Sequence, residues 1–280
     1  MKWNNVVTDV KSISIEKAKD YIQTTAADAF QLVDVRQPQE YNKEHLPGAI
    51  LAPLNELMGG TVNLKKELPL LVYSREGERS LAAAQWLITQ EYTGVQIIEG
   101  GLNRWNGYKA SGHSELNLKL IKPDAEFPDA LSLAYAMEEG LRLFYIELAR
   151  ETKEDVFKKL YRKMASLEVE HKQVLAKRYS ISEGKELIQK ERENHEDQLL
   201  EGGGYADITL IKTLANTNNA HDIFSLALAM ETQALDFYIR LARQAIDEKS
   251  ETFFLEMADE EKKHLVFISA QMDKYLSETE

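Results

Sequence analysis

Two stretches of this chain repeat each other at a fixed offset of 93 residues. The copies cover residues 132–150 and 225–243, and twelve of the nineteen aligned positions are identical. Each copy contains a glutamate within an apolar stripe, and each is followed, still in register, by a Glu-x-x-His sequence. Solvated surface pairs have no reason to recur in a gapless repeat, so these charged residues are expected to share one task.

Six residues of the repeat form a candidate metal-ligand set. In chain order they are Glu138, Glu168, His171, Glu231, Glu261 and His264. Residues three apart project from one face of a helix, so the two side chains of each Glu-x-x-His can bind the same ion. A glutamate from each of two helices and a Glu-x-x-His from each of the other two are the ligands of a dimetal four-helix bundle. The repeat therefore predicts an all-α bundle in the C-terminal half.

The apolar surroundings of these glutamates imply a bound cation. Ala134, Met137 and Leu141 flank Glu138 at helical spacing. An ionised carboxylate in such a setting is costly unless another charge neutralises it. Four carboxylates and two neutral imidazoles carry a charge of about −4, which two divalent cations would cancel. Oxygen and imidazole ligands suit iron or manganese, so we expect two iron ions, with manganese or a mixed pair as the alternatives.

A tyrosine follows the first glutamate of each copy by two helical turns. Tyr145 and Tyr238 therefore lie on the same helix faces as Glu138 and Glu231. Two interpretations are equally open. Either the hydroxyl groups hydrogen-bond ligand carboxylates and orient them, or the rings belong to the core and their hydroxyl groups are satisfied locally.

The C-terminal half, residues 125–280, resembles the ferritin-like superfamily and, within it, the rubrerythrin-type di-iron domains. The resemblance implies that the six residues are the metal ligands and that Glu168 and Glu261 bridge the two ions. It also implies reduction of peroxide, activation of dioxygen or oxidation of ferrous iron. The chain departs from the family at Ala234, where rubrerythrins carry a further glutamate, and it has no rubredoxin-like Cys-x-x-Cys segment. Electrons are therefore expected from a separate protein.

Residues 1–112 follow a different pattern, in which short apolar runs alternate with helical ones. This alternation is typical of a largely parallel α/β sheet. The predicted strands are 29–35, 49–52, 70–73 and 95–98, and the predicted helices are 15–21, 39–44 and 79–90. Residues 113–128 are predicted to be a linker. The bundle is predicted at 129–280, with helices near 129–151, 154–179, 220–247 and 249–276 and a crossover at 180–219.

Three motifs of the N-terminal half resemble those of rhodanese domains. The run 32–49 matches their opening signature, residues 74–80 (Ser-Arg-Glu-Gly-Glu-Arg-Ser) match their active-site loop, and residues 100–105 match their closing motif. The resemblance covers residues 1–112. It implies a parallel sheet flanked by helices, with the loop running from the end of a strand into a helix.

Ser74 stands where rhodaneses have the cysteine that carries transferable sulfur. A hydroxyl group cannot form a persulfide and lacks the reactivity of a thiolate, so Ser74 is a vestigial nucleophile position in an inactive sulfurtransferase. The loop with Arg75, Gly77 and Arg79 would still favour an anion. A role in docking or folding alone is the equally open alternative. A serine engineered in place of a native cysteine would read identically in this sequence.

The composition limits the possible partners, cofactors and cellular location of the protein. The net charge of −12 argues against a nucleic-acid partner, because phosphate contacts need clustered lysine and arginine. The chain has no cysteine, which excludes disulfides and iron–sulfur clusters held by its own thiolates. Neither a signal-peptide core nor an apolar run of about 20 residues is present, so we expect a cytoplasmic protein without a membrane partner.

The sequence is compatible with two candidate functions. The first is a di-iron oxidoreductase that acts on peroxide or dioxygen, takes electrons from an external donor protein and forms a homodimer. The second is a non-catalytic protein that senses metal or oxidant and uses the rhodanese-like half for docking. Fast peroxide turnover by the reduced protein distinguishes the two.

Overall fold

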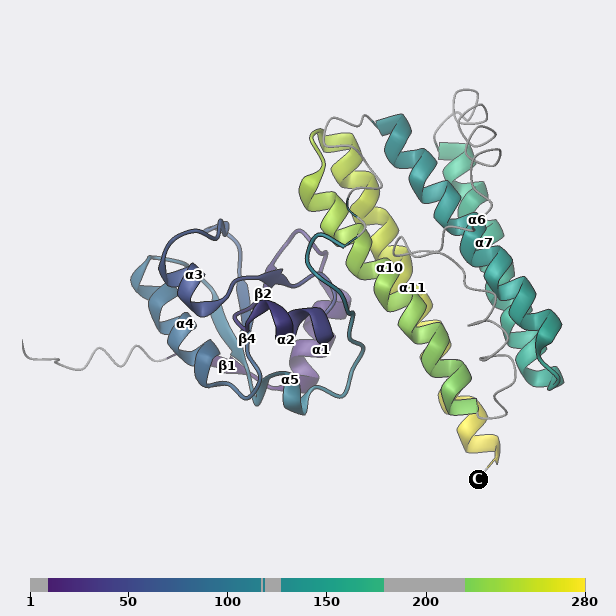
Figure 1. Cartoon of the computed structure of the whole chain (residues 1–280), viewed down its shortest axis with the longest axis horizontal. Helices are drawn as coiled ribbons and strands as arrows, with labels where there is room; N and C mark the ends of the chain where they lie inside the picture. Colours follow the sequence, from purple (N-terminus) through teal and green to yellow (C-terminus); the bar gives the residue numbers. More distant parts are fainter. Residues whose placement is uncertain (1–9, 117, 119–126, 179–219, 280) are drawn as a thin grey trace, which may run out of the picture. The chain divides into compact units, whose positions relative to one another are not determined.

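The computed structural model describes residues 10–116, 118, 127–178 and 220–279 (Figure 1). The chain forms two compact units, Met1–Leu116 and Asn117–Glu280. The predicted linker, 113–128, spans the junction between these units. The predicted crossover, 180–219, lies outside the described residues.

The N-terminal unit is built on a five-stranded sheet in which every pairing is parallel. The order is β1-β5-β4-β2-β3, so β4 lies at the centre. The strands are β1 (Lys11–Ile13), β2 (Gln31–Asp34), β3 (Ile50–Leu51), β4 (Leu70–Tyr73) and β5 (Val95–Ile98). All residues of β2 and β4 are buried, as expected for parallel strands covered on both faces.

Helices cover both faces of this sheet. They are α1 (Ile15–Thr24), α2 (Pro38–Lys43), α3 (Leu54–Met58), α4 (Glu78–Thr89) and α5 (Gly101–Arg104). Alternate strand residues face opposite sides, so Leu71 joins the apolar cluster containing residues of α1, α2 and α5. Val72 joins the second cluster, beneath α3 and α4. The sheet is thus held between two apolar layers, and its carboxyl edge positions the loop after β4.

The C-terminal unit consists of long helices in two pairs. Their bounds are α6 (Phe127–Glu151), α7 (Asp155–Arg178), α10 (Ala220–Gln244) and α11 (Glu248–Thr279). Helix α6 packs beside α7, and α10 packs beside α11 (Figure 1). Three residues connect each pair, which makes the partners antiparallel neighbours. Asp247 caps α11, because its carboxylate accepts hydrogen bonds from the backbone N–H and the hydroxyl group of Ser250.

Helical periodicity in the sequence explains the apolar interior of the bundle. On α6, Ala134, Leu141 and Leu148 are buried at spacings of seven, two helical turns. Aromatic side chains join the two pairs. Phe157 of α7 meets Phe224 of α10 edge to face, with 6.5 Å between ring centroids. This interior is where the candidate ligands lie.

The predicted fold class is confirmed: a parallel α/β unit precedes a helical unit. Strands β4 and β5 match the predicted ranges. Strand β1 and helices α3 and α5 were not predicted, since each has only three to five residues. None of the described helices is both long enough and apolar enough to cross a membrane.

Candidate functional site

The six predicted ligands converge inside the bundle. Helix α6 provides Glu138, α7 provides Glu168 and His171, α10 provides Glu231, and α11 provides Glu261 and His264. The four carboxylates are completely buried. Four separate helices are therefore needed to assemble the group, and each contributes through the face that its apolar stripe turns inward.

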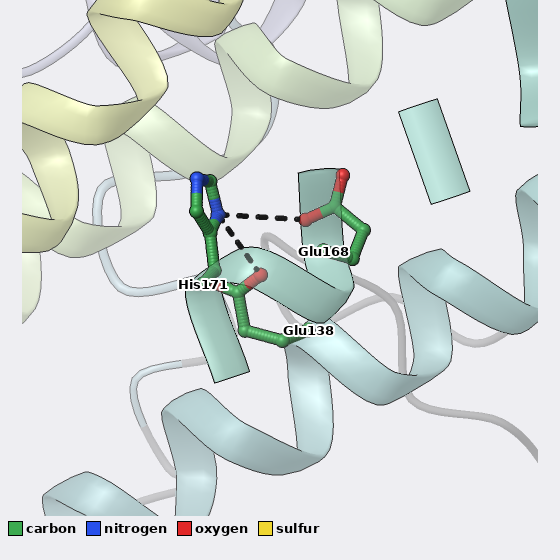
Figure 2. A group of neighbouring side chains, drawn as sticks. All are labelled: Glu138, Glu168 and His171. Atoms are coloured by element: carbon green, nitrogen blue, oxygen red, sulfur yellow. Dashed lines mark ion pairs between the residues drawn. The ribbon is translucent and has the colours of Figure 1, made fainter. Parts of the chain in front are cut away.

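The first half of the site lies between α6 and α7. Figure 2 shows that the His171 ring faces both neighbouring carboxylates. Its Nδ1 atom is 3.4 Å from Oε2 of Glu138 and 3.6 Å from Oε2 of Glu168. One atom from each of these residues lies within 4.8 Å of the others, a separation that a single metal ion can span.

The second half lies between α10 and α11 and has shorter contacts. Nδ1 of His264 is 2.9 Å from Oε2 of Glu231 and 3.2 Å from Oε2 of Glu261. The hydroxyl group of Tyr145, on α6, donates a hydrogen bond of 2.6 Å to Oε1 of Glu231. This tyrosine therefore orients a carboxylate of the opposite helix pair.

The two halves meet at the histidines and at Glu168. The rings of His171 and His264 are stacked with centroids 4.4 Å apart, and their Nε2 atoms are 3.0 Å apart. Glu168 groups with Glu138 and His171 on one side and with Glu231 and His264 on the other. A carboxylate shared in this way is placed to bridge two ions.

The charge balance of the residues present fits a pair of metal ions. Burial and the negative charges of Glu138 and Glu231 raise the pKa of Glu168 well above its usual value. Burial likewise raises the pKa of Glu261, although His264 opposes the rise. Both oxygens of Glu138 and of Glu168 are buried and accept no hydrogen bond from a described residue. Buried oxygens of this kind are suited to a divalent cation.

Histidine protonation offsets only part of this charge. Burial opposes protonation of His264, but Glu231 and Glu261 raise its pKa to about 12. Burial also opposes ionisation of Glu231, yet His264 and the Tyr145 hydroxyl group lower its pKa. In the absence of a metal ion, His264 therefore offsets charge in one half of the site only. Two imidazoles and four carboxylates remain a suitable donor set for iron or manganese.

Three further sequence positions have definite places. Tyr145 and Tyr238 are both fully buried, and Tyr145 makes the ligand contact described above. The ring of Tyr145 also stacks on that of Tyr161, which the sequence reading missed. Ala234 is buried on α10 and offers no ligand atom.

The loop of the N-terminal unit holds Ser74 in a cradle of backbone amides. Ser74 follows β4, is buried, and accepts hydrogen bonds on Oγ from the N–H groups of Gly77 (3.1 Å) and Ser80 (3.3 Å). Gly77 has a φ of 119°, which favours glycine and turns the chain into α4. The geometry that would surround a nucleophile is therefore retained around a hydroxyl group.

Helix α5 fixes the outer side of this loop. The N–H groups of Leu102 and Asn103 donate to the carbonyl groups of Ser74 (2.9 Å) and Arg75 (3.0 Å). Gly101 has no room for a side chain, because a Cβ atom would lie 2.3 Å from the Ser74 carbonyl oxygen. The Gly-Gly pair of the closing motif signals this close approach, although the sequence reading gave it no role.

One of the two arginines of the loop, Arg79, already has a carboxylate partner. Both terminal nitrogens of Arg79 bind the carboxylate of Glu40, at 2.6 and 2.7 Å. The Arg79 guanidinium lowers the pKa of Glu40 to about 2. Glu76 and Glu78 lie in the same segment as the exposed Arg75. An anion at the loop would thus compete with Glu40 for Arg79, a partnership the sequence reading did not identify.

Comparison with known proteins assigns both halves. Residues 14–108 match the family model of the rhodanese-like domain, and residues 129–202 and 222–280 match that of rubrerythrin. The chain is 30% identical over 113 residues to the thiosulfate sulfurtransferase GlpE of Pseudomonas entomophila, covering 39% of this chain and all of that protein.

Two further matches cover smaller shares of this chain. The chain is 34% identical over 77 residues to YqhL of Bacillus subtilis, covering 28% of this chain and 61% of that protein. It therefore spans less than two thirds of that relative. A rhodanese-related protein from Thermoplasma volcanium shares 24% identity, with a TM-score of 0.32 and coverage of 36% of this chain and 97% of the other.

The first prediction concerns stability. Iron added to the metal-free protein should raise the melting temperature of the C-terminal unit and leave that of the N-terminal unit unchanged. Binding at a hundredfold excess over Kd adds about 2.7 kcal/mol, or roughly 5–10 °C in a unit of this size. Differential scanning calorimetry of the metal-free and iron-loaded chains should show one of two transitions moving. Movement of both, or of neither, would contradict the placement of the ions in the bundle.

The second prediction concerns the loop. The unchanged protein should transfer no sulfur from thiosulfate to cyanide, because Ser74 cannot carry a persulfide. Ser74→Cys should introduce measurable transfer, since the amide cradle of Gly77 and Ser80 is already formed. Thiocyanate production measures both proteins, with Ser74→Ala as the matched control. Activity in the unchanged protein would overturn the inactive reading, and an inactive cysteine variant would leave docking as the role of this unit.

Proposed function

We propose that this chain, which belongs to the rhodanese-like family through residues 14–108 and to the rubrerythrin family through residues 129–202 and 222–280, is a di-iron oxidoreductase that reduces peroxide or dioxygen. One observation carries the proposal. Three of the four buried carboxylates and both histidines form two groups whose ligand atoms lie within 4.8 Å of one another, and the fourth carboxylate, Glu261, lies 3.2 Å from Nδ1 of His264. The rhodanese-like unit is an accessory without sulfur transfer.

The residues of the site would divide the work of holding two ions. Nδ1 of His171 and Nδ1 of His264 each face the carboxylates of their own half. Glu168 would bridge, as its contacts with both halves support, and Glu261 would bridge by its repeat-related position. Glu138 and Glu231 would complete one half each. Ferrous ions bound there would supply one electron each to an oxygen–oxygen bond.

The protein surroundings would protect and orient this chemistry. The complete burial of the carboxylates keeps bulk water away from the ligands and strengthens their electrostatic effect. The Tyr145 hydroxyl group fixes one rotamer of Glu231. Reduction of one peroxide to two waters consumes two electrons and two protons, and the chain has no cysteine with which to hold a rubredoxin-type donor site. A separate electron-donor protein would re-reduce the ions.

The second candidate is a sensor in which metal or oxidant binding changes the bundle and the rhodanese-like unit docks a partner. The Ser74 loop favours this candidate, because that unit retains its fold but not its nucleophile. Turnover separates the two functions. An enzyme would consume many equivalents of peroxide with reduced methyl viologen as electron donor, whereas a sensor would be oxidised once.

The third prediction is metal content and reactivity. Protein matured with iron should contain about two ions per chain. The fully reduced protein should react with one hydrogen peroxide per chain, because two ferrous ions provide the two electrons required. Elemental analysis and stopped-flow absorbance measure these quantities. Iron content near zero, or oxidation no faster than that of free ferrous ion, would contradict the proposed function.

The fourth prediction tests one ligand. His171→Ala should lower the iron content toward one ion per chain and weaken metal affinity by about a hundredfold, because an imidazole leaves the ligand set. Glu170→Ala is the matched control, since Glu170 is the exposed neighbour of His171 on α7. Calorimetric titration of the metal-free variants provides the affinities. Equal losses in both variants would show that His171 is not a ligand.

A further inference from the structure

The internal repeat gives each half of the metal site an outer layer, and the two layers differ in chemistry. Four non-ligand positions next to the ligands can be compared across the offset of 93 residues. In the first copy they are Tyr135, Glu139, Arg142 and Lys172, and in the second they are Leu228, Thr232, Leu235 and Leu265. The same backbone positions are thus polar around α6 and α7 but mainly apolar around α10 and α11.

The polar layer joins α6 to α7 directly outside the ligands. Glu139 accepts hydrogen bonds from Nε and Nη2 of Arg142, at 2.8 and 2.7 Å, and forms an ion pair with Lys172. The Lys172 ammonium group also lies 5.3 Å from the centroid of the Tyr135 ring. Glu139 follows the ligand Glu138, and Lys172 follows the ligand His171. The Glu139–Lys172 ion pair is therefore offset by one residue on each helix from the Glu138–His171 ion pair, which Figure 2 shows.

Solvent reaches the polar side more easily. The His171 side chain is 12% exposed, whereas that of its repeat partner His264 is 6% exposed. Glu139 and Lys172 are partly exposed, and the four residues of the apolar layer are all buried. The α6–α7 side is therefore the more accessible of the two sides of the site.

The two layers also differ in how easily they open. The side chains of Lys172 and Glu139 are 14% and 15% exposed, and the lysine stem that carries the ammonium group is long and flexible. Movement of Lys172 away from Glu139 would break the contact between the residues that follow Glu138 on α6 and His171 on α7. On the other side, Leu265 would have to leave a packed interior, which is rigid.

The charge of the polar layer suits small polar or anionic molecules. Glu139 pairs with two cationic side chains, Arg142 and Lys172. Cationic groups therefore outnumber carboxylates among the four residues of this layer. Peroxide and small anions would be tolerated there, whereas a purely apolar layer would exclude them.

We propose that small polar ligands of the metal site enter between α6 and α7, beneath the Glu139–Lys172 ion pair, and that the α10–α11 side is closed to them. This port rests on the proposed function and specifies the route that its oxidant takes. Glu139 and Lys172 act on access and bind no metal ion.

The test is azide binding to the iron-loaded, oxidised full-length protein, followed by stopped-flow absorbance. The double variant Glu139→Thr with Lys172→Leu installs on the first side the residues that the repeat has on the second. Its azide association and dissociation rates should both fall by about tenfold, while Kd stays unchanged, because closing a port slows both directions equally. A purely structural disturbance of the ligands would change Kd.

Lys158→Leu is the matched control, because it removes the same charge from the same helix. Lys158 pairs with Asp155 and lies roughly 21 Å along α7 from Lys172. Its azide rates should equal those of the unchanged protein. Equal slowing in this control, unchanged rates in the double variant, or a change in Kd alone would overturn the port.

Two further outcomes are decisive as well. If the double variant fails to hold two ions, Lys172→Met, which keeps the stem and removes the charge, should still slow both azide rates, and unchanged rates would overturn the port. If azide produces no new absorption band in the unchanged protein, the proposed function falls together with the port. Failure of the port alone would leave that band intact.

Discussion

Four glutamate carboxylates buried at the centre of a helical bundle are the constraint on which the C-terminal unit depends. Taking a carboxylate out of water is costly, and two or more close together raise the cost because their charges repel. The bundle supplies limited compensation: Nδ1 of His264 contacts Glu231 and Glu261, and the Tyr145 hydroxyl group donates a hydrogen bond to Glu231. Glu138 and Glu168 are left with buried oxygens that no described residue satisfies. Binding of two divalent cations would resolve this imbalance.

The repeat explains both the symmetry of the ligand set and its departures from symmetry. Equivalent backbone positions place equivalent ligands, so each helix pair brings two carboxylates and one histidine. Around them the copies diverge, as the pairs Glu139/Thr232 and Lys172/Leu265 show. One half of the site therefore lies beside charged, partly exposed side chains, and the other is enclosed by mainly apolar packing. A site that must exclude bulk water and still admit a small substrate benefits from this division.

The rhodanese-like unit keeps an ordered loop after β4 with a serine, not a cysteine, at position 74. Two kinds of contact keep the loop in place. The N–H groups of α5 donate to the Ser74 and Arg75 carbonyl groups, which does not depend on the side chain at position 74, whereas the N–H group of Gly77 donates to the Ser74 hydroxyl oxygen itself. The Arg79–Glu40 pair then occupies the guanidinium that would otherwise face an incoming anion. A ligand or partner of this unit must therefore be sought at its other surfaces, or at the loop with Ser74 and the Arg79–Glu40 pair in place.

The sequence was most informative where spacing and chemistry coincide. Helical periodicity and the repeat predicted which residues would meet in the bundle, because ligands three residues apart must share a face. Short elements such as β1 and α5 were missed, since tertiary contacts rather than local propensity determine them. The Glu40–Arg79 pair joins residues 39 positions apart, a separation for which no local pattern exists. Spacing also could not show that Tyr145 contacts Glu231 of the opposite helix pair. Tyr145 lies two turns from Glu138 on the same face of α6, so the sequence is equally compatible with a contact to Glu138.

The central claim is that the buried carboxylates hold two metal ions between the ligand helices. Anomalous diffraction from crystals of the iron-matured protein, recorded on both sides of the iron absorption edge, tests it most directly. We expect two anomalous peaks about 3.5–4 Å apart, enclosed by Glu138, Glu168, His171, Glu231, Glu261 and His264. A map without peaks there, in which these carboxylates turn to solvent or pair with protein cations, would contradict the account.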